Sequence, residues 1–318
     1  MALHSMPRLQ LAARTRAERQ QVRRKLRKLR DARIHRRTLT KYQQYVSAFQ
    51  LWVHSVGLFP ATTVETLDRQ LMEFIEWLWD EGFGKADAGY TLSAVQHTLQ
   101  VKRCFVGAWG LFRVWSRLEL PVRAPPMPVR VAFGLAGACA SLQRNDLATI
   151  MVLAFAAMLR TTEFLTLRFS FLHFSYQLDR LVIVLPLTKS GQRKGTIEHV
   201  VVDDGPVVRL VHRLTQGRCD NQLIFGESAQ SFRRIFDDML DQLGLSSLNL
   251  RPYSFRRGGA TESFNHSQSM DAILERGRWC SPNTARIYLT AGLNELNNMR
   301  ILPRSDEWLR VLVSRLLA

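Results

Sequence analysis

The sequence predicts a mainly α-helical protein with one small antiparallel sheet, an α+β fold. Apolar residues recur at helical spacing through most of the 318 residues. Three short, partly β-branched apolar segments instead predict strands, at 169–174, 181–187 and 199–202. Gly191 and Gly195, between the last two segments, indicate a long hairpin tip. After Asp204 the pattern is helical again to the end of the chain.

A helical first domain is expected at residues 38–120. Apolar residues over 42–56 follow the i, i+3, i+4, i+7 rule and predict its first helix. Thr62 and Glu65 form a capping-box pattern that opens a second helix, which is expected to end at Gly82. Two further helices complete this domain, at about 91–102 and 105–117.

The prolines of residues 121–128 predict a linker, because proline lacks a backbone donor and restricts the residue before it. The second domain follows at 129–300 and opens with two helices, the second at Asp146–Leu159. The last segment, 301–318, is a predicted helix with apolar residues on one face: Trp308, Leu309, Leu312 and Leu316. This face can dock onto a second subunit or pack on its own domain, and both alternatives are open.

Basic residues are concentrated at the N-terminus. The net charge is +17, and residues 1–37 hold 13 Lys/Arg and 2 Asp/Glu, so this arm alone supplies 13 − 2 = +11. Such a surplus attracts a polyanion, because each cation against a phosphate releases condensed counterions. The densest run predicts DNA contacts from Arg23, Arg24, Lys25, Arg27 and Lys28. A solvated tail that aids solubility or nuclear import is the open alternative.

The composition favours no membrane, metal or disulfide class. The longest apolar run, Ile150–Leu159, is shorter than the roughly 20 residues of a bilayer span. The four cysteines lie far apart without a CxxC motif, which predicts neither a zinc site nor a disulfide framework. We expect a protein without a metal, a cofactor or a membrane partner.

Two short motifs place single cations near the predicted sheet. Arg160 follows a very apolar helix, and Glu163 is at the i, i+3 spacing that lets a carboxylate orient it. Lys189 stands at the mouth of the hairpin, where a lysine can reach into a cleft and deliver a proton. Each motif alone also fits an ordinary surface ion pair or a solvated turn lysine. Arg193 and Lys194 lie close to Lys189 and can be confused with it.

A more specific block surrounds a second arginine. In a helix, Tyr253 and Arg256 share a face, whereas Arg257 points about 100° away, where a DNA contact is expected. Gly258 and Gly259 together cost a helix roughly 2 kcal/mol. Such a pair is usual where another backbone or a phosphate approaches closely.

The fourth motif joins two aromatic residues. Ser281 and Pro282 are a favourable N-cap and N1 pair, so Trp279 precedes a helix and Tyr288 lies inside it. Trp279 and Tyr288 are nine positions apart. Taken alone, a helical tyrosine between two aliphatic residues also fits the core.

The order of these motifs resembles the tyrosine recombinase (phage integrase) family, including versions found in mobile elements. Motif support covers about residues 128–292, and the first domain is similar in type to the family's core-binding, DNA-binding domain. The resemblance therefore implies a tyrosine recombinase catalytic domain in the second half of the chain. Its catalytic positions match Arg160, Lys189, Tyr253, Arg256, Trp279 and Tyr288, with Glu163 in support.

The resemblance implies strand exchange without a metal. Tyr288 would attack a DNA phosphodiester to form a 3′-phosphotyrosyl link, while Arg160 and Arg256 hold the non-bridging oxygens. Lys189 would protonate the leaving 5′ oxygen, and Trp279 would pack against the phosphate. The covalent link keeps the bond energy, so site-specific recombination or integration needs neither ATP nor a cofactor.

One position departs from the family pattern, because Tyr253 stands where the family usually has histidine. A phenol can donate to a phosphate oxygen, but with an unperturbed pKa of about 10 it is a poor general base. Two alternatives stay open: a catalytically impaired, recombinase-derived DNA-binding protein, and a type IB topoisomerase-like relaxation activity.

The expected partners follow from charge and resemblance together. They are double-stranded DNA and, as in the family, a homotetramer on paired sites. The expected location is intracellular and DNA-associated, in the nucleus of a eukaryote or in the cytoplasm and nucleoid of a bacterium.

Overall fold

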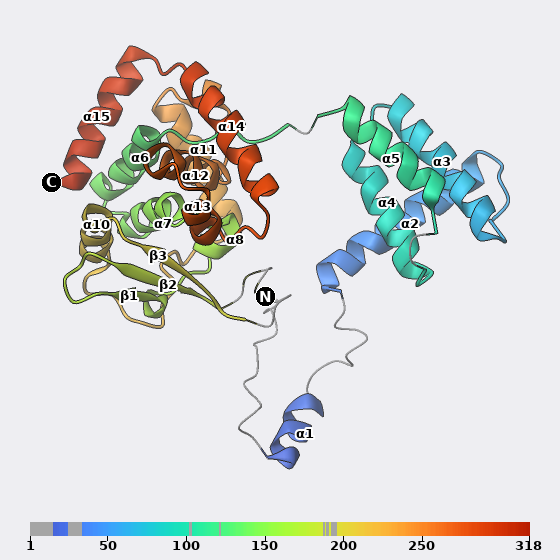
Figure 1. Cartoon of the computed structure of the whole chain (residues 1–318), viewed down its shortest axis with the longest axis horizontal. Coiled ribbons are helices and arrows are strands. Elements are labelled where there is room, and N and C mark those ends of the chain that lie inside the picture. Colours follow the sequence, from blue (N-terminus) through green and yellow to red (C-terminus); the bar gives the residue numbers. More distant parts are fainter. Residues whose placement is uncertain are drawn as a thin grey trace. The chain divides into compact units, whose positions relative to one another are not determined.

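The computed structural model describes residues 15–24, 34–101, 104–120, 122–186, 188, 191 and 196–318. For residues 22, 284, 287, 288, 290, 291, 293, 294 and 298 it describes the backbone alone. The chain divides into two compact units, Met1–Val122 (unit 1) and Arg123–Ala318 (unit 2) (Figure 1). Each unit has a hydrophobic core of its own.

Unit 1 is helical. Its helices are α1 (Arg16–Arg24), α2 (Arg36–Ser55), α3 (Val64–Asp80), α4 (Lys85–Thr98) and α5 (Val106–Leu118). Helix α2 packs along α4, and α3 packs along α5 (Figure 1). Aromatic rings fill the core, where Phe74 meets Phe49 and Trp52 edge-on at centroid distances of 5.3 and 5.1 Å. Such contacts bury large apolar area and fix how the helices pack.

The helix starts in unit 1 depend on side-chain caps. The N-cap of α3 is Thr63 rather than the predicted Thr62, because Thr63 Oγ1 accepts the N–H of Thr66 at 3.2 Å. Helix α4 begins well before the predicted residue 91, because an Asp87 carboxylate oxygen accepts the N–H of Gly84 at 3.2 Å. Pattern alone cannot choose between neighbouring threonines or find a distant carboxylate cap.

Unit 2 surrounds a small sheet with helices. Its first helices are α6 (Val129–Ser141), α7 (Asn145–Ala156), α8 (Thr161–Phe164), α10 (Gly205–Thr215) and α11 (Ala229–Gln242). The last four are α12 (Ser254–Ser267), α13 (Met270–Gly277), α14 (Pro282–Asn298) and α15 (Pro303–Leu317). The strands are β1 (Leu172–Phe174), β2 (Leu181–Leu185) and β3 (Glu198–Val202). A mostly helical chain with a small antiparallel sheet confirms the predicted fold class.

The sheet has the order β1-β2-β3, and both pairings are antiparallel. Leu181, Ile183 and Leu185 of β2 are buried, so alternate side chains of this strand face the core. Leu185 and Glu198 form the last pair between β2 and β3, next to the connecting residues 186–197, which include Lys189 in the sequence.

Helix α7 lies in the core of unit 2 and ends in a sharp reversal. It was predicted to run to Leu159 but ends at Ala156, because Met158 has a φ of +48°. The N–H groups of Met158 and Leu159 bond the carbonyls of Phe155 and Ala154 at 3.2 and 3.1 Å, the pattern of a Schellman turn. The turn leads directly into Arg160. No helix within the described ranges, α7 included, is long and apolar enough to cross a membrane.

The glycine pair of α12 lies against other backbone segments. A Cβ added to Gly258 would lie 2.1 Å from the carbonyl oxygen of Met127, and one added to Gly259 would lie 2.0 Å from that of Phe155. Of the two explanations given for the pair, the close approach of another backbone is the one observed. The approach lets α12 press against α7, which brings Arg256 beside the α7 turn.

Helix α15 packs on α6 of its own unit. Leu309, Leu312 and Leu316 are buried, and Leu309 fills the space beside Gly134. Packing on its own domain is one of the two alternatives that the sequence left open. Trp308 departs from the predicted face and is 54% exposed.

We predict that Gly259→Ala destabilises unit 2 by about 2 kcal/mol. The substitution gains about 1 kcal/mol of helix propensity. The new Cβ must however displace the Phe155 carbonyl, a backbone group that cannot rotate away, so the overpacking cost is at the upper end of the usual range, about 3 kcal/mol. Urea unfolding measures the difference. Gly226→Ala is the control, because a Cβ there meets no atom within 4 Å. Equal stability of the two variants would contradict the packing described for α12.

Candidate functional site

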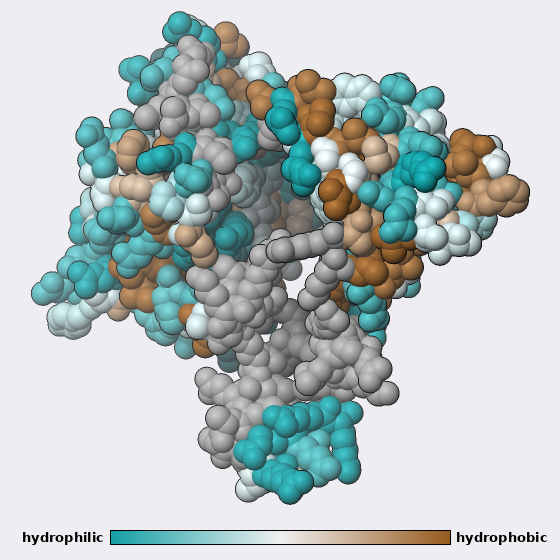
Figure 2. Space-filling view, turned by 45° about the vertical axis from the view of Figure 1, so that its right-hand side comes forward, coloured by the Kyte–Doolittle hydropathy of each residue, from teal (hydrophilic) through white to brown (hydrophobic). Residues whose placement is uncertain are grey.

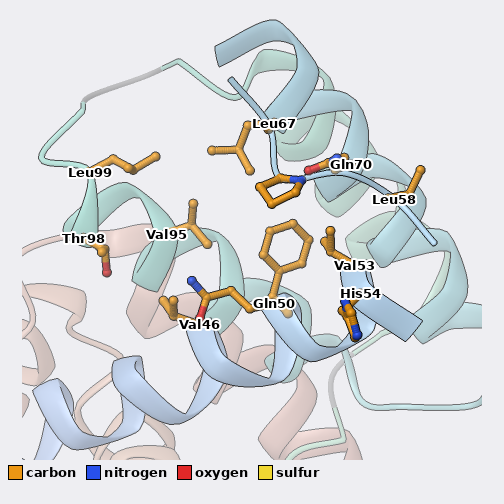
Figure 3. Close-up of a pocket in the computed structure, with 13 residues that line it drawn as sticks. Val46, Gln50, Val53, His54, Leu58, Leu67, Gln70, Val95, Thr98 and Leu99 are labelled. Carbon is orange, nitrogen blue, oxygen red and sulfur yellow. The ribbon is translucent and has the colours of Figure 1, made fainter. Parts of the chain in front are cut away.

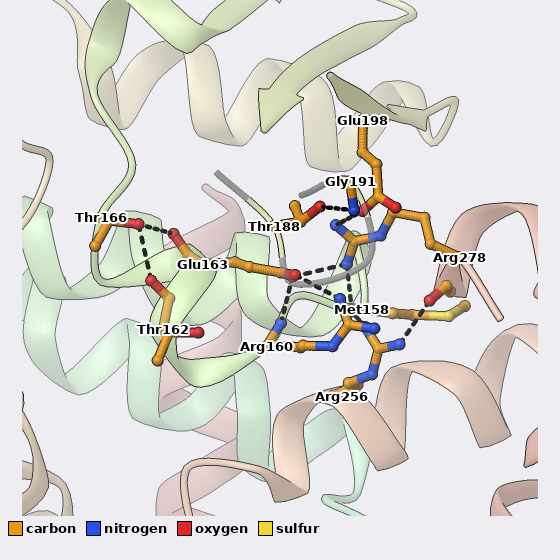
Figure 4. Close-up of polar contacts among 11 residues, drawn as sticks. Met158, Arg160, Thr162, Glu163, Thr166, Thr188, Gly191, Glu198, Arg256 and Arg278 are labelled. Carbon is orange, nitrogen blue, oxygen red and sulfur yellow. Dashed lines mark hydrogen bonds and ion pairs between the residues drawn. The ribbon is translucent and has the colours of Figure 1, made fainter. Parts of the chain in front are cut away.

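A carboxylate at the start of α8 joins two arginines. Arg160 is the N-cap residue of α8, and its backbone N–H donates to Glu163 Oε2 at 2.8 Å while its Nη1 donates to Oε1 at 2.6 Å. Arg278 Nη2 donates to the same Glu163 Oε2 at 2.8 Å (Figure 4). The Glu163 side chain is 4% exposed, so this ion-pair network lies away from bulk water. The predicted pairing of Arg160 with Glu163 is therefore present in the structure.

Arg256 lies in the same cluster and is 1% exposed. Its guanidinium donates to the carbonyl of Met158, at the α7 turn, and to the carbonyl of Gly277 at 2.5 Å. Its Nε is buried and has no hydrogen-bond partner among the described residues. A cation held by neutral carbonyls keeps its whole charge, so Arg256 favours an anion nearby.

Trp279 covers Arg256. The guanidinium carbon lies 4.5 Å from the centroid of the Trp279 ring, which is a cation–π contact. The ring folds back over Gly277, where an added Cβ would lie 2.0 Å from a ring carbon. Glycine at this position is therefore required for the tryptophan to reach the arginine.

The cluster contains a third guanidinium, that of Arg278. Its side chain is 6% exposed and lies between two carboxylates, with Glu163 at 2.8 Å and Glu198 at 4.0 Å (Figure 4). Arg278 has a left-handed backbone with φ of 55°, which non-glycine residues rarely adopt. Sequence reasoning did not single out either Arg278 or Glu198. In the sequence, the only sign that Arg278 belongs to the site was its place between Gly277 and Trp279. No sequence feature pointed to Glu198.

The cluster is rich in positive charge. Burial, followed by the nearby Arg160 and Arg278, lowers the pKa of Arg256 to about 10. Burial alone would raise the pKa of Glu163, but Arg278 and Arg160 outweigh it and hold that pKa below its ordinary value. Three guanidiniums around Glu163, with Glu198 at the edge, create a field that attracts an anion of phosphate size.

Two residues of the Tyr253–Gly259 block have different surroundings. Tyr253 precedes α12 directly, is partly buried and lies near enough to Arg256 to affect its pKa. Arg257 is 1% exposed and donates to the Ala124 carbonyl and to Glu295 at 3.2 Å. A guanidinium enclosed in this way does not suit the DNA contact that the sequence suggested, and we do not assign Arg257 that role.

Some of the other predicted site residues lie outside the described part of the chain. Lys189, Lys25, Arg27 and Lys28 lie outside them, while Arg23 and Arg24 are exposed residues of α1. Figure 2 shows the hydrophilic surface of α1 at the bottom of the view. Tyr288 lies within α14, but its side chain is not described. Helix α14 is held against α12, since Leu289 packs with Met158 and Ala260.

Unit 1 has a pocket of a different character, with a volume of about 410 Å³. Apolar side chains of α2, α3, α4 and the adjoining loops line most of it, including Val46, Val53 and Val95 (Figure 3). Among the described residues no Lys or Arg lines it, so none of these cations is available there to pair with an anion. The arginine cluster of unit 2 is the better candidate for chemistry.

No family model and no curated protein sequence matches this chain. Among solved structures, the Tn1549 transposon integrase in complex with transposon right end DNA matches with a TM-score of 0.57 and 10% identity, over 88% of this chain and 96% of that one. The same integrase with circular intermediate DNA matches with a TM-score of 0.55 and 11% identity, over 93% and 100%. The chain has a tyrosine recombinase/integrase fold.

Another solved structure matches this chain with a lower TM-score. The XerA recombinase matches with a TM-score of 0.42 and 16% identity, over 86% of this chain and 96% of that one. At these identities the comparison concerns the path of the backbone, and the site must be judged from its own residues.

We predict that Glu163→Gln destabilises unit 2 by about 3–5 kcal/mol at neutral pH, because removing one partner of a buried pair strands the other charge. The lowered pKa means that Glu163 stabilises the folded state fully above pH 4.5, and that this contribution is lost as pH falls through the folded-state pKa. The difference between wild type and variant, measured by urea unfolding, should therefore shrink below pH 4.5.

The matched control is Glu227→Gln, which breaks the pair of Arg144 and Glu227, whose side chains are 37% and 42% exposed. Exposed pairs contribute about 0–1 kcal/mol, so this change should be small. Comparable losses for the two glutamates would refute the role of Glu163 as the centre of the cluster.

Proposed function

We propose that this protein cleaves and rejoins double-stranded DNA through a covalent 3′-phosphotyrosyl link, as a tyrosine-type recombinase or integrase. The observation that carries the proposal is the meeting of Arg160 and Arg256, 96 positions apart in sequence, around one buried carboxylate. The recombinase/integrase fold supports it, as does the position of Tyr288 on a helix packed against the α12 that bears Arg256.

The proposed chemistry follows from the charge of the cluster. Displacement at a phosphodiester builds negative charge on the non-bridging oxygens, and planar guanidiniums match that charge with paired donors. Arg160, whose side chain is 30% exposed, is the cation of the cluster most open to a substrate. Arg256 would complete the clamp, with Trp279 packed over it. Donors fixed before the reaction stabilise the transition state without reorganisation.

The covalent step balances without a co-reactant. The Tyr288 hydroxyl would lose its proton to water as its oxygen forms a bond to phosphorus, the bond from phosphorus to the 5′ oxygen would break, and Lys189 would give the leaving oxygen its proton. Attack by a 5′ hydroxyl of a partner strand reverses the step and releases Tyr288. Tyr253 would donate a hydrogen bond to the phosphate.

Charge distribution supports DNA as the partner. Helix α2 carries three Lys/Arg and no Asp/Glu, whereas α3 carries five Asp/Glu and one Arg. We therefore propose that unit 1 presents α2 to DNA and turns α3 away. The N-terminal arm would add affinity without sequence preference. By resemblance, assembly on paired sites would be as a homotetramer.

We predict that a nicked suicide duplex traps the protein in a covalent adduct, and that Tyr288→Phe forms none, because the attacking oxygen is missing. Denaturing electrophoresis with a labelled strand measures the adduct. Arg160→Ala should lower its rate of formation by about 10²–10³, the usual loss for one oxyanion donor, while the DNA dissociation constant changes little.

The result also separates the alternatives. DNA binding without any adduct would support an impaired binding protein and overturn the proposed enzyme. Relaxation of supercoiled DNA without recombinant product would support the topoisomerase-like alternative. Equal loss of binding and adduct in Arg160→Ala would argue against its role in the transition state.

We predict that replacing Arg23, Arg24, Lys25, Arg27 and Lys28 with glutamine weakens DNA binding and flattens its salt dependence. If all five contact phosphates, the slope of log K against log salt falls by about 4.5, at 0.9 for each contact. Fluorescence anisotropy across a salt series measures the slope, and Tyr288→Phe should leave it unchanged. An unchanged slope in the five-fold variant would favour a tail for solubility or import.

A further inference from the structure

Arg278 has a backbone conformation that is unfavourable for a residue with a Cβ atom. Its φ of 55° and ψ of 41° lie in the left-handed region, where a Cβ crowds the chain and glycine is preferred. The N–H groups of Arg278 and Trp279 bond the carbonyls of Glu275 and Leu274 at 3.1 and 3.0 Å, which is the Schellman pattern also found at Met158. The end of α13 therefore accounts for the backbone of Arg278, whereas its buried side-chain contacts are a separate feature.

Those contacts join three elements that are distant in sequence. Arg278 stands between α13 and α14, Glu163 belongs to α8, and Glu198 is the first residue of β3. Arg278 Nη2 donates to Glu163 Oε2 at 2.8 Å, and Nη1 lies 4.0 Å from Glu198 Oε2 (Figure 4). The side chains of Glu163, Arg278 and Glu198 are 4%, 6% and 12% exposed, so water screens their attraction weakly.

Arg278 also has donating capacity to spare. Its Nε and Nη1 are buried without a hydrogen-bond partner in the described part of the chain. A buried donor left without a hydrogen bond is unfavourable, so its presence in a folded protein calls for an explanation. Nη1 faces the carboxylate of Glu198, the first residue of β3. Nη2 faces the carboxylate of Glu163, which also accepts from Arg160.

We propose that Arg278 is a positioning residue for strand cleavage, which ties the base of the β2–β3 hairpin to the Glu163–Arg160 pair. The inference rests on the proposed function, since it concerns the residues expected to clamp the phosphate and protonate the leaving oxygen. Arg278 does not touch the substrate in this proposal. It sets the orientation of Glu163, and through Glu163 that of Arg160, while holding Glu198 and with it the end of β3.

A guanidinium suits this role better than an ammonium. Its planar fork offers donors in two directions, so that one side chain can bond carboxylates on opposite sides. Lysine at the same position keeps the charge but lacks the fork. Arg276, in the last turn of α13, offers a matched comparison, because it pairs with Asp203 outside the cluster.

The test compares Arg278→Lys, Arg278→Gly, Glu198→Gln and the control Arg276→Lys in the full chain. We expect Arg278→Lys to slow adduct formation at least tenfold on the suicide duplex, with the DNA dissociation constant within twofold of wild type. Arg276→Lys should keep the wild-type rate. Arg278→Gly relieves the left-handed backbone, so it should fold, yet it should be as slow as Arg278→Lys.

Two readouts separate positioning from mere folding support. Guanidinium ion at millimolar concentration should partly restore the rate of Arg278→Gly, compared with the same concentration of NaCl, and should not change that of Arg278→Lys. Glu198→Gln should slow wild type but add little to Arg278→Lys, because both remove the same link. Wild-type rates in both Arg278 variants, or additive effects with Glu198→Gln, would overturn the inference.

Failure of the proposed function would look different. If wild-type protein forms no adduct, the proposed enzymatic activity is refuted, whatever the role of Arg278. The link would then be judged from urea unfolding without DNA, where Arg278→Lys and Glu198→Gln should still be non-additive. Additive losses of stability would refute the tie between Arg278 and β3 independently of any activity on DNA.

Discussion

The buried carboxylate of Glu163 is the interaction on which the rest of the site depends. It receives Arg160 from one side and Arg278 from the other, and it offsets part of the repulsion among three guanidiniums. Without an anion at this position, Arg160 and Arg278 would both lose a carboxylate partner, and the repulsion among the three guanidiniums would be offset less. With it, the cluster keeps a net positive charge but a fixed shape, which is what recognition of a phosphodiester requires.

Backbone features supply the rest of this fixed shape. The Schellman turn at Met158 gives a carbonyl that is free to accept from Arg256, and the glycine pair of α12 lets that helix approach closely enough to use it. Gly277 in turn allows Trp279 to close over the guanidinium. Small residues and a left-handed turn thus determine where the large cations lie.

The sequence predicted most of the architecture and part of the site, for physical reasons. Helical periodicity and β-branched segments are local signals, so the fold class and the pairing of Arg160 with Glu163 could be inferred from spacing. Arg278 could not, because its partners lie 115 and 80 positions away and its backbone conformation depends on the packing of α13 and α14. Arg257 was misleading for the same reason, since its enclosure by Ala124 and Glu295 is a tertiary property.

The carbonyls that hold Arg256 have a consequence for folding. They belong to residues 158 and 277, which lie 98 positions before it and 21 after it. Contacts of such long range form only after loop closure over much of unit 2, so we expect Arg256 to reach its place in the cluster late in folding. The basic arm needs no such closure. On the function proposed above, a nascent or partly folded chain would therefore be able to adhere to nucleic acid before it could cut it, and chemical competence would report on the integrity of the whole unit.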